Sequence, residues 1–108
     1  MAFYPEDVQK LLTTKNCDGC QLLSADLKEA TLIKASLKKA MLNDANLSWA
    51  NLDHVNFESA VMENADLSWA QLNFANLSKV YFKGADLRYI SSNSANYRDA
   101  YFQKADLS

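Results

Sequence analysis

Few residues of this 108-residue chain have the types and spacing that catalysis requires. The single histidine, His54, follows Asp53 and precedes Glu58. No nucleophile on a sharp strand-to-helix turn and no oxyanion loop accompany these groups, and a base alone does not make a hydrolytic site. The sequence therefore predicts no catalytic residue, no cofactor and no enzymatic activity.

A pair of cysteines is the second candidate for chemistry. Cys17 and Cys20 enclose an Asp-Gly dipeptide. Two thiols supply only half of a four-ligand zinc site, and no strand–helix–strand pattern indicates a redox motif. We expect buried, reduced thiols and no metal; a local disulfide and metal or redox chemistry are the alternatives.

Acidic and amide residues recur at intervals of twenty. Successive carboxylates in such a series could attract a cation if they stacked. Short polar side chains also form hydrogen bonds readily with nearby backbone groups. We therefore expect a solvated ladder of side chains that hydrogen-bond to the backbone. The series comprises Asp26, Asn46, Asp66, Asp86 and Asp106.

A five-residue repeat sets these intervals. Fourteen of the fifteen alanines share one register between residues 25 and 105, and a large apolar residue follows two positions after nearly every repeat start. A helix would spread this pattern around its circumference, and a plain strand would alternate its faces. A short extended edge followed by a corner satisfies it, and four corners close a coil of twenty residues.

The repeat units ADLKE (25–29), ANLSW (45–49) and ADLRY (85–89) resemble those of pentapeptide-repeat proteins. The resemblance implies an all-β solenoid, the right-handed quadrilateral β-helix. We expect residues 17–108 to form about four and a half coils. Residues 1–16 would form a capping helix and lead-in segment, with the helix at about 5–14 and its apolar residues Val8, Leu11 and Leu12 covering the first coil.

The repeat also predicts a filled interior. Residues twenty apart should stack, as in the column Leu27, Leu47, Leu67, Leu87 and Leu107. Ser92 is small where a large residue is expected, and Ile90 is large where alanine is expected. We interpret this pair as packing compensation. An interior packed in this way leaves no room for a ligand of ordinary size.

Outward aromatic residues form the candidate contact face. Trp49, Trp69 and Tyr89 lie twenty apart and should stack on the surface, with Glu29 at the head of their column and Phe74 at the next corner. Contiguous apolar surface indicates a contact site, for a partner protein or for self-association. Rings that only stabilise the ladder are the alternative.

The C-terminal coil is the second candidate contact, because no capping helix follows it in the sequence. An uncovered coil edge favours pairing with a second copy. We expect a two-fold homodimer in which Tyr97, Phe102 and Leu107 approach their symmetry mates and Tyr101 lies outside them.

Charge and hydropathy limit the remaining functions. The net charge is −2, and no apolar run is long enough to span a membrane. We expect no nucleic-acid or membrane partner and, without a signal peptide, a cytoplasmic protein. A non-catalytic scaffold or protein-binding module is favoured. The resemblance also implies an alternative, a DNA mimic that inhibits gyrase, but a mimic needs a longer and more acidic rod than about 22 Å of stacked coils.

Overall fold

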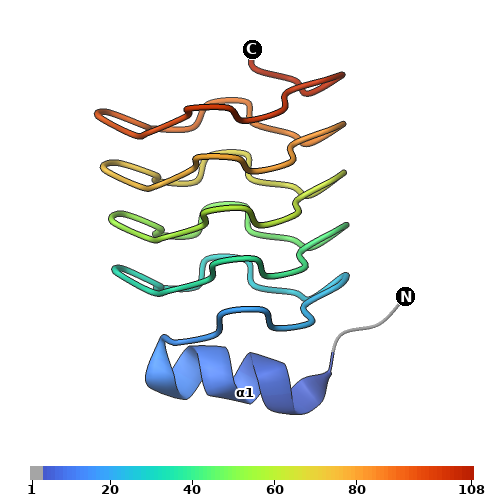
Figure 1. Cartoon of the computed structure of the whole chain (residues 1–108), viewed down its shortest axis with the longest axis vertical. Coiled ribbons are helices and arrows are strands. Elements are labelled where there is room, and N and C mark those ends of the chain that lie inside the picture. Colours follow the sequence, from blue (N-terminus) through green and yellow to red (C-terminus); the bar gives the residue numbers. More distant parts are fainter. Residues whose placement is uncertain (1–3) are drawn as a thin grey trace.

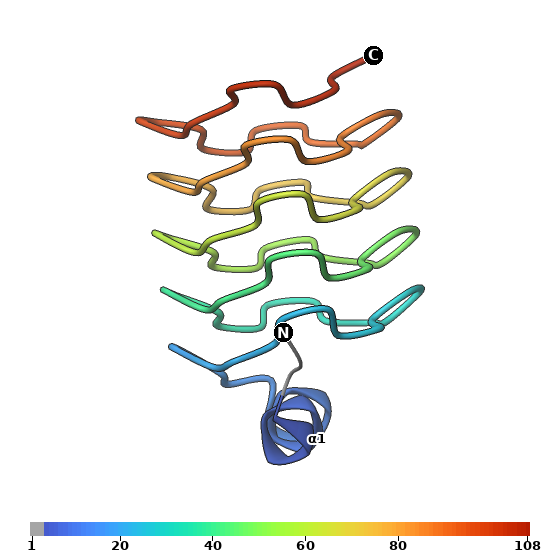
Figure 2. The same cartoon turned by 90° about the vertical axis from the view of Figure 1, so that its right-hand side faces the viewer.

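The protein is a four-sided solenoid that begins with one helix. The computed structural model describes residues 4–108, in which α1 (Pro5–Thr14) leads directly into the coils. Isolated parallel bridges join residues twenty apart, from Asn16 and Ser36 to Asp86 and Asp106. Figures 1 and 2 show the coils stacked along one axis, with α1 across their N-terminal end. The predicted twenty-residue coil and the helix at 5–14 are confirmed.

Backbone hydrogen bonds explain why the coil repeats. The Leu22 N–H donates to the Met41 carbonyl at 2.8 Å, and the Asn46 N–H donates to the Ala25 carbonyl at 2.9 Å. Within the coil, the Ala25 N–H closes a turn onto the Leu22 carbonyl at 3.1 Å. The same three bonds recur along the solenoid, so the polar backbone of the inner coils is satisfied without long strands.

Each corner uses a left-handed backbone residue. Trp49, for example, has φ 63° and occupies the third position of the turn that the Ala50 N–H closes onto Leu47. Positive φ at this position is the requirement of a type II turn. Branching at Cβ makes such a φ unfavourable. Accordingly, none of the seventeen non-glycine residues with positive φ among residues 4–108 is Val, Ile or Thr.

The interior consists of stacked small and large apolar columns. Ala65 and its stacked neighbours Ala45 and Ala85 are each 1% exposed, and Phe57 is fully buried. The predicted inward register is therefore confirmed through the central coils. In the last coil the same positions are only partly covered, and Ile90, Tyr97 and Phe102 pack against the core from its edge.

Helix α1 closes the N-terminal end of the core. Leu11 is fully buried and Val8 packs partly against the same cluster, but Leu12 is 41% exposed. The expectation that Leu12 covers the first coil is therefore wrong, because the helix presents a narrower stripe to the coil. Asp7 fixes the helix in place, since its Oδ2 accepts the Gln21 N–H at 2.7 Å.

Cys17 and Cys20 form a disulfide, so the expectation of reduced thiols is wrong. The repeat provides the reason. The Cys20 N–H closes a corner turn onto the Cys17 carbonyl at 3.1 Å, which brings the two Cα atoms to 5.3 Å. That separation lies within the range that a disulfide spans. Both residues remain buried, as the register predicted.

Candidate functional site

The aromatic column of Trp49, Trp69 and Tyr89 forms a continuous stack on the outer surface. Ring centroids are 4.9 Å apart for Trp49 and Trp69, and 4.6 Å apart for Trp69 and Tyr89. The rings come from equivalent corners of successive coils, so the coil spacing sets their separation. The side chains are 54%, 46% and 58% exposed, respectively. The structure thus brings together three of the predicted contact residues in what we call the tryptophan column.

Phe74 lies at a different corner from the tryptophan column. Its ring stacks on the His54 ring at 5.0 Å, with an interplanar angle of 8°. His54 therefore has an aromatic neighbour, the pairing that the twenty-residue spacing predicts. A further outer column ends with Tyr81 and Tyr101, whose parallel rings are 4.6 Å apart.

The predicted C-terminal contact residues occupy two different environments. Phe102 continues the inner core by stacking on Phe82 at 5.2 Å, and Tyr97 tilts against Phe102 at 5.6 Å. Leu107 and Tyr101 are exposed. These four residues share the last coil, where Tyr97 contacts Phe102 and Tyr101 stacks on Tyr81.

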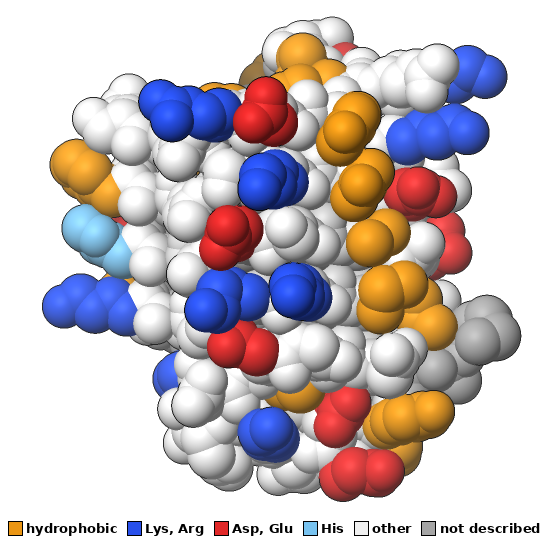
Figure 3. All heavy atoms as spheres, viewed as in Figure 1, with side chains coloured by type: hydrophobic (Ala, Val, Ile, Leu, Met, Phe, Trp, Pro, Cys, Tyr) orange, Lys and Arg blue, Asp and Glu red, His pale blue; other side chains and the backbone are white. Residues whose placement is uncertain are grey.

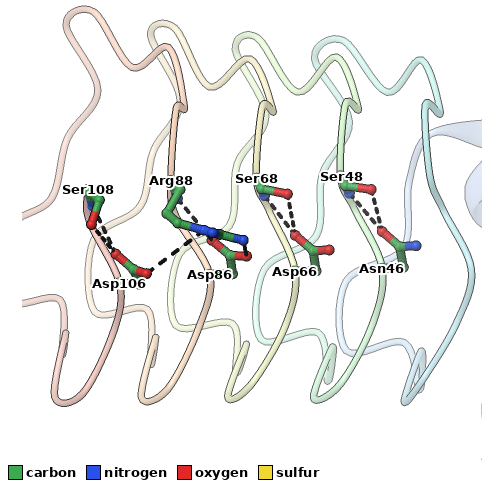
Figure 4. Close-up of polar contacts among 8 residues, drawn as sticks. All are labelled: Asn46, Ser48, Asp66, Ser68, Asp86, Arg88, Asp106 and Ser108. Atoms are coloured by element: carbon green, nitrogen blue, oxygen red, sulfur yellow. Dashed lines mark hydrogen bonds and ion pairs between the residues drawn. The ribbon is translucent and has the colours of Figure 1, made fainter.

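The column of Asp and Asn residues binds its own backbone. Asp66 accepts hydrogen bonds from the Ser68 N–H and hydroxyl at 2.9 and 2.7 Å. Figure 4 shows the same arrangement for Asn46 with Ser48 and for Asp106 with Ser108, whereas Arg88 takes the place of the serine beside Asp86. Asp86 pairs with Arg88 at 2.8 Å, and this hydrogen bond lowers the pKa of the Asp86 carboxyl. A carboxyl group whose pKa is lower in the folded than in the unfolded state stabilises the fold at pH values above its unfolded-state pKa. This contribution is lost as pH falls through the folded-state pKa.

The mixed-charge face shown in Figure 3 alternates basic and acidic side chains beside a row of hydrophobic ones. A shallow hollow of about 650 Å³ lies at a corner that carries charges of both signs. Its lining consists of Asp18, Gly19, Lys38, Lys39, Glu58, Ser59 and Lys79. Asp18 is held there by the Ser36 hydroxyl at 2.5 Å, a bond that lowers the pKa of its carboxyl.

A second hollow, of about 450 Å³, lies against Trp49. Trp69 covers one face of the Trp49 ring, and the other face is directed toward the preceding coil, where Glu29 occupies the equivalent corner. The hollow is lined by Lys28, Glu29, Thr31, Trp49 and Asn51. Sequence reasoning placed Glu29 in this column but did not predict the hollow.

The repeat itself identifies the family. The family model for pentapeptide repeats matches eight copies, over residues 20–58, 40–73, 50–89 and 75–108. These matches cover most of the chain and coincide with the region of twenty-residue coils. The chain belongs to the pentapeptide-repeat family. Membership implies a right-handed quadrilateral β-helix, in agreement with four corners per coil. Pentapeptide-repeat proteins are generally structural or binding scaffolds.

Solved pentapeptide-repeat proteins share partial similarity with the chain. HetL, involved in heterocyst differentiation regulation in the cyanobacterium Nostoc sp. strain PCC 7120, is 26% identical, with a TM-score of 0.45 over 85% of this chain and 48% of HetL. A protein from the Arabidopsis thaliana thylakoid lumen is 29% identical, with a TM-score of 0.40 over 75% of this chain and 60% of that protein.

QnrB1, a plasmid-mediated fluoroquinolone resistance protein, is 22% identical, with a TM-score of 0.39 over 90% of this chain and 65% of QnrB1. The chain thus spans about half the length of HetL. No curated protein sequence matches it. Since these TM-scores are below 0.5, family membership rests on the repeat match.

Within residues 4–108, no group of three or more His, Cys, Asp or Glu side chains is arranged to hold a metal ion. No helix in this part of the chain is long and apolar enough to cross a membrane.

Proposed function

We propose that this pentapeptide-repeat protein is a non-catalytic scaffold that binds a partner protein through the tryptophan column. The observation that carries the proposal is the exposure of three stacked rings, Trp49, Trp69 and Tyr89, on a surface whose other corners are mainly polar. Trp and Tyr are enriched among the residues that dominate binding energy at interfaces. Because the rings hold one another in place, little side-chain entropy remains to be lost on binding.

The charge distribution favours a scaffold over a DNA mimic. Mimicry of duplex DNA requires a regular row of negative charge. In the Asp column, Arg88 pairs with Asp86 at 2.8 Å and lies 3.8 Å from Asp106. Lysines also interrupt the acids on the mixed-charge face. A net charge of −2 also gives the protein little of the long-range negative potential that attracts a DNA-binding enzyme.

Affinity capture with paired variants tests the proposed interface. The double variant Trp49→Ala/Trp69→Ala removes two exposed stacked rings, and His54→Ala/Phe74→Ala is its matched control at another corner. We expect the first variant to lower recovery of a partner whose binding saturates by at least about ten-fold. The control should leave recovery within about two-fold of that with the parent protein. Equal losses from both variants would contradict the proposal.

We also propose that a second copy stacks on the last coil. The side chains of Leu107 and Tyr101 are exposed there, and Phe102 extends the core to this edge. In an inner coil, the N–H group equivalent to that of Phe102 bonds to the following coil. The Phe82 N–H, for example, donates to the Tyr101 carbonyl at 2.7 Å. Backbone groups and apolar side chains at a coil edge favour pairing with another chain.

Sedimentation of two single variants tests the dimer. We expect Phe102→Glu to shift the protein from dimer to monomer, because it places a charge in the proposed interface. Trp69→Glu, on the lateral surface, should leave the dimer intact. A parent protein that sediments as a monomer at high concentration, or a dimer lost only in Trp69→Glu, would refute the end-to-end arrangement.

A further inference from the structure

The hollow against Trp49 combines an aromatic face with a carboxylate. Trp69 covers one side of the Trp49 ring. On the other side the column continues into Glu29, and no further aromatic ring among residues 4–108 stacks on Trp49. No ion pair is formed by Glu29 among residues 4–108. The tryptophan column therefore ends in an open ring face with an unpaired negative charge one coil below it.

We propose that this hollow receives an arginine side chain from the partner protein. A guanidinium group is planar, stacks on aromatic faces and pairs with carboxylates in a fork geometry. It would stack under the exposed face of Trp49 and lie beside the Glu29 carboxylate, in the layer that a further ring of the column would fill. The inference deepens the proposed function, on which it rests, by assigning the chemistry that the partner presents.

The polar lining fits this assignment. Thr31, which also lines the hollow, carries a hydroxyl group. The side-chain Oδ1 of Asn51 already accepts the Asp53 N–H at 3.2 Å, so Glu29 is the main acceptor for a guanidinium. Lys28 also lines the hollow and opposes a cation. Lys28 therefore allows a test of the charge of the ligand, because removal of Lys28 strengthens cation binding and weakens anion binding.

The test is a titration followed by the two indole N–H signals in an NMR spectrum of ¹⁵N-labelled protein. The probe is the blocked peptide acetyl-Gly-Arg-Gly-amide, and its neutral counterpart carries citrulline in place of arginine. We expect the arginine peptide to shift the Trp49 indole more than the Trp69 indole, and to bind at least about ten-fold more tightly than the citrulline peptide. Equal binding of the two peptides would overturn the proposal.

Three variants sharpen the result. Glu29→Gln should weaken binding of the arginine peptide by about ten-fold, while its matched control Glu63→Gln, which lies outside the hollow, should not. Lys28→Gln should tighten binding. If Glu29→Gln and Glu63→Gln behave alike, or if Lys28→Gln weakens binding, the proposal fails.

Two comparison ligands distinguish the occupant. A lysine peptide that binds as tightly as the arginine peptide would contradict a planar guanidinium, and tighter binding of guanosine monophosphate would assign the hollow to a nucleotide. The proposed function is judged separately. If Trp49→Ala/Trp69→Ala loses the partner while the arginine peptide causes no shift, only the present inference falls. If the peptide binds while partner capture is unaffected, the proposed function falls.

Discussion

Replacing Phe57 with alanine is expected to lower the free energy of unfolding by about 3–5 kcal/mol. The Phe57 side chain is fully buried between Leu37 and Leu77 of the neighbouring coils, both of which are also fully buried. Its removal costs the transfer of a large apolar group and leaves a cavity that the rigid ladder cannot readily close.

Phe74→Ala is the matched control for this change. Phe74 is 57% exposed at a corner and contacts the His54 ring, so its loss is expected to change the free energy of unfolding by less than about 1 kcal/mol. Urea denaturation of the two variants, followed by circular dichroism, measures the difference. Similar destabilisation by both changes would show that the inward and outward positions are wrongly assigned.

Ala65→Leu is expected to have the second-largest effect, a loss of about 1–3 kcal/mol in the free energy of unfolding. Ala65 is 1% exposed and stacked between Ala45 and Ala85, so three added carbon atoms have no space. The cost follows from strain in neighbouring side chains and backbone, because native cores are already close-packed.

Gln71→Leu provides the comparison for added apolar volume. Gln71 is exposed on an outer edge, and its backbone N–H bonds to the Ala50 carbonyl at 3.0 Å whatever its side chain. We expect the Gln71→Leu protein to have the same midpoint of thermal unfolding as the parent protein, within experimental error. The midpoint of the Ala65→Leu protein should fall by several degrees. A stable Ala65→Leu protein would refute the close-packed alanine column.

Much of the fold could be predicted from sequence because the repeat ties each residue to a fixed place in the coil. Alanine at most of the fifth positions restricts the inner corner to small side chains, which fixes the five-residue register, and four such units make one coil. The same register placed Trp49, Trp69 and Tyr89 in one outer stack, with separations of 4.9 and 4.6 Å. It also gave the Asp column its bonds to nearby backbone, as at Asp66.

Other features depend on geometry that the pattern does not contain. The disulfide required the 5.3 Å separation of Cys17 and Cys20 across a corner turn. Leu12 was misplaced because helical periodicity predicts an apolar face but not how much of it the first coil covers. The hollow against Trp49 depends on how far side chains of unequal size project from adjacent corners, which residue spacing does not specify.

The most direct test of the proposed function is photo-crosslinking from the tryptophan column. Benzoylphenylalanine would replace Trp69, and in a matched control it would replace Lys79, which lies at the mixed-charge corner and has the same positive φ. The proposed interface predicts a crosslinked partner from position 69, whose yield falls when excess parent protein is added before irradiation, and none from position 79. Equal crosslinking from both positions, or a partner crosslinked only from position 79, would contradict it.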